Sequence, residues 1–198
     1  MLGETPADKA TFLLSAPAFA PRFATWVTPV DKATFLLSAP AFAPRFSTWV
    51  AYTELMTSSL KLFGISDIIK TIVFHPDYSR AAVEPSNSLK AGHLPPLAWM
   101  PNMMRSALKG LLAEDFDYSV SDFQRRAPCP AINVLRAEMM DTFVTNTENI
   151  VSLDDGRHVR VSGARVYCAN TRELAAVGAE ALEAALHKEM EGLAVPLP

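Results

Sequence analysis

The chain has 198 residues, of which 49% are hydrophobic and 20% are charged, and this composition is typical of a single globular domain. Its net charge of −3 excludes a broad basic surface for nucleic acid, and its apolar runs are far shorter than the roughly 20 residues that span a membrane. Two cysteines, Cys129 and Cys168, are too few for a disulfide framework, so we expect reduced thiols and a cytoplasmic location.

The N-terminal part contains one 23-residue segment twice, at residues 5–27 and 28–50, and the two copies differ at only two positions. Repeat folds need about three units, and their units drift apart in sequence. Two near-identical copies therefore indicate a recent duplication rather than a functional repeat. We expect residues 1–30 to be an extra or displaced segment, because only the second copy leads directly into residues 51–63.

The second copy predicts a strand, a helix and another strand. Residues 33–37 form a short apolar run, and apolar side chains then recur at helical spacing through residues 41–63, with Gly64 as the helix stop. A β-branched run at residues 68–74 follows directly. Parallel strands are usually joined by a right-handed crossover. We therefore predict an α/β fold whose small sheet contains this parallel strand–helix–strand unit, with helices packed against it and Trp49 in the core.

The remaining chain predicts two insertions in a single α/β domain at residues 31–192. Residues 83–118 begin with loop signals and contain a helix, which is either a lid or a packed surface helix. Residues 149–168 alternate apolar and polar side chains, which predicts a hairpin with its turn at Gly163 before a last helix. Residues 193–198 are expected to be a frayed tail.

The first candidate site lies where the 68–74 strand ends, in the sequence His75-Pro76-Asp77-Tyr78. Ligand sites in open α/β folds usually lie at such strand ends. His75 could act as a general base, Asp77 could orient it, and Tyr78 could donate a proton to a developing oxyanion. The alternative is a structural histidine that bonds to backbone at a strand end.

A second candidate block, residues 124–138, places cations beside prolines. We interpret Pro128 and Pro130 as the start of a helix. Cations just before a helix N-terminus, together with its free backbone amides, form an anion site. Arg126 and Arg136 are the candidates to bind the anion. The alternative is that these arginines pair with nearby acids on the surface.

These two blocks resemble the signature of an uncharacterised family, number 1415 of the domains of unknown function. The matching residues are Phe-His-Pro-Asp-Tyr at 74–78 and the Arg-x-Pro-x-Pro pattern that begins at Arg126, and the resemblance extends over about residues 31–192. The family pattern has an aromatic residue where this chain has Cys129 and a histidine where it has Asn133. The resemblance implies an α/β fold in a divergent form, and it implies no substrate.

We therefore predict a cytoplasmic α/β protein that binds a small anionic ligand between the His75 turn and Arg126, with hydrolytic or acid–base chemistry. The ligand-binding candidates are Arg80, Arg126, Asn133 and Arg136. The alternative is a non-catalytic structural or protein-interaction domain in which the same residues hold the fold. We expect no nucleic-acid or membrane partner. The sequence identifies no cofactor and predicts no metal site, because a metal would need a third ligand.

Overall fold

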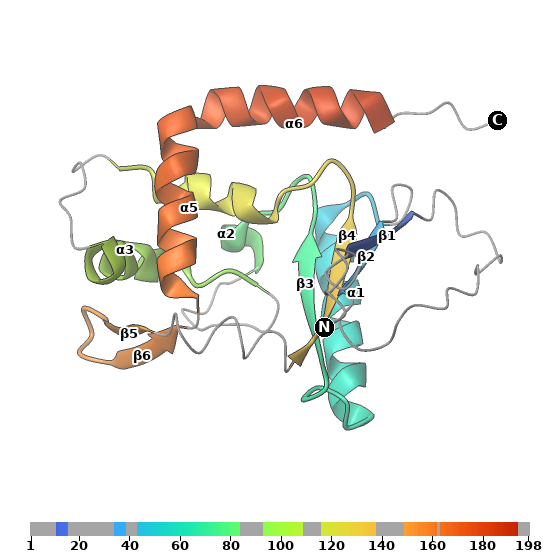
Figure 1. Ribbon diagram of the computed structural model, residues 1–198, viewed down its shortest axis with the longest axis horizontal. Coiled ribbons are helices and arrows are strands. Elements are labelled where there is room, and N and C mark those ends of the chain that lie inside the picture. Colours follow the sequence, from blue (N-terminus) through green and yellow to red (C-terminus); the bar gives the residue numbers. More distant parts are fainter. Residues whose placement is uncertain are drawn as a thin grey trace, which may run out of the picture.

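The computed structural model describes residues 11–15, 34–38, 43–83, 93–108, 116–137, 149–161 and 163–193. The predicted tail beyond residue 193 and most of the first copy of the duplicated segment lie outside these ranges. Figure 1 shows two parts side by side: a sheet with one long helix, and a group of helices with a small hairpin. In the described ranges, no helix is long and apolar enough to cross a membrane.

The strands are β1 (Thr11–Ser15), β2 (Thr34–Ser38), β3 (Ile69–Phe74), β4 (Ala131–Arg136), β5 (Asn149–Ser152) and β6 (His158–Val161). The α-helices are α1 (Phe46–Leu62), α2 (Arg80–Val83), α3 (Met100–Leu108), α5 (Ala164–Val177) and α6 (Ala179–Leu193). Two 3₁₀ segments are η2 (Leu97–Trp99) and η3 (Tyr118–Arg125). This mixture of helices and small sheets confirms the α/β class.

The larger sheet has the strand order β1-β2-β4-β3, and β4 is antiparallel to both of its neighbours. β2 and β3 therefore run in the same direction without pairing, and within the described sheet only β1 and β2 pair in parallel. The predicted parallel unit at residues 33–37, 41–63 and 68–74 is wrong in this respect. Its two strands are separated by β4, which comes from much later in the chain.

β4 also replaces the helix that Pro128 and Pro130 were expected to begin. Ala131–Arg136 forms a ladder with β2 on one side and with β3 on the other. The β-branched side chains of Ile132 and Val134 suit extended backbone, and two ladders satisfy backbone groups that a short helix would leave unpaired at its ends. Because these residues form a strand, the helix predicted after Pro128 and Pro130 is wrong, and the anion-binding roles of Arg126 and Arg136 stay predictions.

Helix α1 packs on the larger sheet and closes its core. Trp49 is 2% exposed and lies in one buried cluster with Ala43, Val73 and Ile132. Phe46 is partly buried and packs against the same cluster. The aromatic side chains of α1 therefore face the sheet, which confirms the helical phase predicted from their spacing.

Glycines end two of the helices. α1 ends at Leu62, and Gly64 follows with a φ of 68°, a left-handed conformation that suits glycine. The predicted stop at Gly64 is confirmed. The last helix, predicted as one element, is divided into α5 and α6 because Gly178 adopts a φ of 89° between them.

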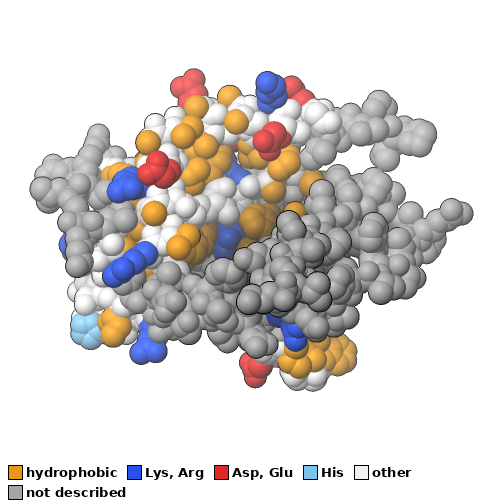
Figure 2. All heavy atoms as spheres, in the orientation of Figure 1, with side chains coloured by type: hydrophobic (Ala, Val, Ile, Leu, Met, Phe, Trp, Pro, Cys, Tyr) orange, Lys and Arg blue, Asp and Glu red, His pale blue; other side chains and the backbone are white. Residues whose placement is uncertain are grey.

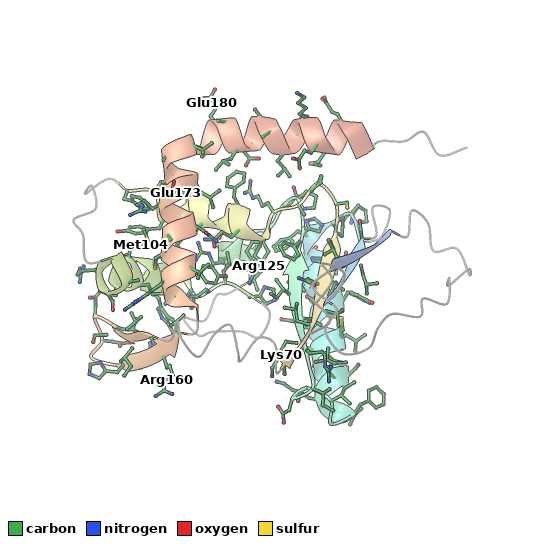
Figure 3. The ribbon with its side chains drawn as sticks, in the orientation of Figure 1. Lys70, Met104, Arg125, Arg160, Glu173 and Glu180 are labelled. Carbon is green, nitrogen blue, oxygen red and sulfur yellow. The ribbon has the colours of Figure 1, made fainter. Side chains whose placement is uncertain are left out.

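A second core lies between α3, α5 and the β5–β6 hairpin. Met100, Met103 and Met104 are fully buried and pack with Val151 and Val161 (Figure 3 labels Met104 on α3). Burial of several large apolar side chains stabilises this part by the hydrophobic effect. The helix predicted within residues 83–118 is therefore part of a core in this structure.

The hairpin predicted at residues 149–168 forms, but from different strands. β5 and β6 pair in antiparallel fashion, and both precede Gly163. The expected second arm is instead the first part of α5. Ala164 and Cys168 explain the error, because both are buried and their spacing of four residues fits one face of a helix as well as one face of a strand.

Replacing Trp49 by alanine should lower the free energy of unfolding by about 3–5 kcal/mol, the range for an aromatic side chain deleted from a core. Leu62→Ala is the matched control on the same helix, because Leu62 is 83% exposed. That variant should change stability by less than about 0.5 kcal/mol. Urea denaturation followed by circular dichroism measures both values, and equal midpoints for the two variants would contradict the packing of α1.

Deleting residues 5–27 should leave a cooperatively folded protein. β1 is the last strand of the described sheet and pairs there with β2 alone, so its removal leaves the ladders of β4 with β2 and β3 in place. Thermal denaturation followed by circular dichroism tests this. A molten or insoluble product would show that the first copy is an integral part of the fold.

Candidate functional site

Arg80 is buried at the start of α2 and binds two separate parts of the chain, the 3₁₀ segment η3 and the Pro95 carbonyl. Its Nε donates to Oδ1 of Asp122 at 2.5 Å, and its backbone N–H donates to Oδ2 of the same carboxylate at 3.2 Å. Nη1 donates to the Pro95 carbonyl at 2.9 Å, and Nη2 donates to the Tyr118 carbonyl at 3.3 Å and to the Ser121 hydroxyl. Arg80, predicted to bind a ligand, is therefore occupied by contacts within the protein.

His75 lies inside the protein at the end of β3, with 1% of its surface exposed. Its Nδ1 accepts the backbone N–H of Asp77 at 3.0 Å, so Nε2 carries the proton and donates to the Ala43 carbonyl at 3.3 Å. Its own backbone N–H donates to the Arg125 carbonyl at 3.1 Å. Burial lowers the pKa of His75, because it removes the water that would solvate an imidazolium.

The acceptor of the His75 ring, Ala43, has an unusual backbone conformation. Its φ of 49° is left-handed, which costs a residue with a Cβ roughly 1–2 kcal/mol. Ala43 is buried in the cluster that contains Trp49, and the ring of Phe46 lies 5.2 Å from the ring of His75. Both ring nitrogens of His75 thus bond to backbone groups, the arrangement expected under the alternative of a structural histidine.

Asp77 and Tyr78 share a turn with His75 but differ in exposure. The Asp77 side chain is 72% exposed, and its carboxylate lies 4.0 Å from Nδ1 of His75. The Tyr78 side chain is fully buried, its hydroxyl accepts the Leu94 N–H at 3.1 Å, and it lies 3.5 Å from Nδ1 of His93. Burial raises the pKa of Tyr78, so the phenol stays protonated at neutral pH. The catalytic roles of these residues stay predictions.

Arg126 lies beside this turn, where the sequence placed it. Its Nε donates to the Tyr78 carbonyl at 3.2 Å, and its guanidinium lies over the Phe123 ring, 4.4 Å from the centroid. Its Nη1 forms an ion pair with Glu183 of α6. This pairing with a surface acid is the alternative given for Arg126, and it leaves the guanidinium less available to an anion.

The structure does not bring Asn133 and Arg136 to the cluster. Both are in β4, whose ladder places Ala131 opposite Phe74 and Arg136 opposite Ile69. At about 3.4 Å per residue, the five intervening steps carry Arg136 about 17 Å from the His75 end of the sheet. Asn133 lies midway along the strand, and its Oδ1 is buried without a hydrogen-bond partner in the described structure.

Arg125 is the cation that the sequence reasoning missed. Its Cζ lies 5.6 Å from the centroid of the Phe74 ring and 5.9 Å from that of the Tyr167 ring. Its Nε and the Tyr167 hydroxyl are both buried, and neither has a hydrogen-bond partner in the described part of the chain. Figure 3 shows Arg125 near the middle of the molecule, between the helical part and β3.

The charges around η3 do not balance in pairs. Asp122 pairs with Arg80, and Glu183 pairs with Arg126. Arg125 is the third arginine of this group, and no ion pair found among the described residues neutralises it. Figure 2 shows Lys or Arg side-chain atoms among hydrophobic side chains near the middle of this face of the molecule. Here the protein combines an unneutralised cation with apolar surroundings, which strengthen its attraction for an anion.

Among the residues that the structure describes, the other titratable groups form no metal-binding cluster. In the described ranges, no three His, Cys, Asp or Glu side chains gather in a way that could hold a metal ion. Cys129 and Cys168 are both free thiols. Burial raises the pKa of the Cys168 thiol to about 11, and Sγ of Cys129 lies 2.9 Å from the Ser38 hydroxyl.

Three comparisons with known proteins found no match. No family model matches it, no curated protein matches its sequence, and no solved structure matches its fold. The resemblance to the uncharacterised family number 1415 stays a prediction from the blocks at residues 74–78 and 126–130. Function must therefore be argued from the chemistry of the site.

Acidification should destabilise the protein through His75. Its folded pKa lies below the unfolded value of 6.5, so the unfolded chain takes up a proton first as the pH falls. The corresponding stability is present above about pH 6.5 and is lost progressively below it. Urea midpoints at about pH 7.5 and about pH 5.5 measure this loss.

His75→Asn is the matched variant, because asparagine keeps an acceptor for the Asp77 N–H but cannot take up a proton. The variant should be less stable than the parent at neutral pH and should lose less stability on acidification. An equal loss in parent and variant would mean that His75 ionises freely in the folded protein.

Proposed function

We propose that the protein binds a small anionic ligand, a carboxylate or a phosphate, through Arg125 and Tyr167. The observation that supports this is a pair of buried donors without partners, the Nε of Arg125 and the hydroxyl of Tyr167. A buried donor left unsatisfied costs about 1–3 kcal/mol. An anion with two or three acceptor oxygens would satisfy both donors, and a guanidinium binds such groups through parallel hydrogen bonds.

The surroundings of Arg125 favour a negative ligand. Burial raises the pKa of Tyr78 and of Tyr167, so both phenols remain neutral and add no competing negative charge. The Asp122 carboxylate on the same 3₁₀ segment is occupied by Arg80. That ion pair also fixes η3, so the Arg125 backbone is in place before a ligand arrives, which lowers the ordering cost of binding.

This proposal moves the ligand-binding cation by one residue, from Arg126 to Arg125. Arg126 is engaged by Glu183 and by the Tyr78 carbonyl, whereas Arg125 keeps unused donor capacity. Acid–base or hydrolytic chemistry is not part of the proposal, because His75 is buried and both of its ring nitrogens bond to backbone. The rival is a non-catalytic structural or interaction domain, in which Arg125 only packs on aromatic rings.

Two further parts of the proposal rest on other observations. A cytoplasmic location is supported by two cysteines that remain free thiols. Membership of the uncharacterised family number 1415 is supported by the sequence match at residues 74–78 and 126–130.

The binding proposal is tested with inorganic phosphate and acetate as probes, because each carries one of the two anionic groups. The Nε–H resonance of Arg125 in ¹⁵N-labelled protein should shift on titration with at least one probe. Arg125→Gln should weaken binding of that probe about 10–150-fold, since a hydrogen bond to a charged group contributes about 1.5–3 kcal/mol.

Arg126→Gln is the matched control, because it removes a neighbouring arginine of the same charge. It should leave binding of the probe within about threefold of the parent, since its guanidinium is already neutralised by Glu183. Tyr167→Phe should weaken binding by a smaller factor than Arg125→Gln. If neither probe moves the Arg125 resonance, or if Arg126→Gln has the larger effect, the rival interpretation holds.

A further inference from the structure

One edge of the larger sheet pairs two strands of the same sequence. β1 and β2 both read Thr-Phe-Leu-Leu-Ser and lie parallel, with Thr11 opposite Thr34 and Ser15 opposite Ser38. Every residue of β1 therefore lies beside its own copy in β2. The outer edge of β2 already binds a strand of its own sequence within the chain.

The parallel pairing of β1 with β2 can be repeated by a further strand of the same sequence. Because the two strands are identical and in register, β1 is related to β2 by a translation of one strand spacing, about 4.8 Å. A translation can be repeated, so the outer edge of β1 offers the same order of backbone donors and acceptors that β2 offers to β1. Head-to-tail contacts that repeat by translation form an open-ended assembly and not a closed ring. In the described sheet, β1 is the last strand.

The β1 edge also lacks the features that usually prevent strand addition. Natural edge strands are often protected by lysine, proline, a bulge or an inward charge. The five residues of β1 include no charged residue and no proline. The opposite edge strand differs, because β3 carries the exposed Lys70, which Figure 3 labels.

We propose that a second copy of this chain docks on the outer edge of β1 by adding its own Thr11–Ser15 strand in parallel. The second copy is the occupant because it carries the sequence that this sheet already accepts, and its strand continues the β1–β2 pairing. Main-chain hydrogen bonds supply affinity in such strand addition, and the alternating side chains supply register. The incoming strand exchanges the ladder with its own β2 for an equivalent ladder on β1, as in domain swapping, where exchange of an identical element between copies has a low cost.

Sedimentation of the full chain over a roughly hundredfold range of concentration tests the proposal. The protein should associate as its concentration rises. Leu13→Pro should weaken self-association roughly tenfold or more, because proline removes a ladder donor. Leu62→Lys is the control, since it removes an exposed apolar side chain of α1 and should leave the association unchanged. If Leu13→Pro loses helical circular dichroism, Leu13→Lys decides instead, because a charged side chain protects an edge strand.

A labelled peptide of residues 10–16 provides a second readout on the full chain. It should bind, and the same peptide with proline at the Leu13 position should not. A full chain that stays monomeric at every concentration overturns the proposal. Unchanged self-association in Leu13→Pro also overturns it, or in Leu13→Lys if Leu13→Pro has lost helical circular dichroism. Peptide binding without self-association also overturns it, because the second copy would then not be the occupant.

Discussion

The buried ion pair between Arg80 and Asp122 is the contact on which the rest of the arrangement depends. One carboxylate accepts from the backbone and from the side chain of Arg80, and the other guanidinium donors bind carbonyls of Pro95 and Tyr118. A buried charge is costly unless it is paired and hydrogen-bonded, so these acceptors must stay in one arrangement. Because Arg125 follows Asp122 on the same 3₁₀ segment, this contact also sets where the unneutralised guanidinium lies.

Local patterns predicted the parts of the fold whose contacts are local. The aromatic spacing of α1 and its stop at Gly64 were predicted because a helix buries residues that are near in sequence. β4 was not predicted. Residues 131–136 lie next to prolines that suit a helix start as well as an extended strand. Their conformation is decided by ladders with β2 and β3, whose residues are far away in the chain.

The sequence predicted which two segments meet at the candidate site. It did not predict which of their side chains has donors available to a ligand. The turn at His75 and the arginine block do meet, through bonds from His75 to Arg125 and from Arg126 to Tyr78. Arg125 and Arg126 are adjacent and have identical side chains, so the sequence alone does not show which of them is neutralised. Their difference comes from distant partners, because Glu183 neutralises Arg126 while Phe74 and Tyr167 place only aromatic rings beside Arg125.

The duplicated strands also leave the chain with two ways of threading one sheet. Exchanging Thr11–Ser15 with Thr34–Ser38 would place the same five residue types at both positions. The exchange would require the connection from β2 to α1, residues 39–45, to reach one strand spacing further, about 4.8 Å. Seven extended residues span up to about 23–25 Å, so this reach is within their length. Neither the length of this connection nor the side chains of the two strands therefore exclude either strand order.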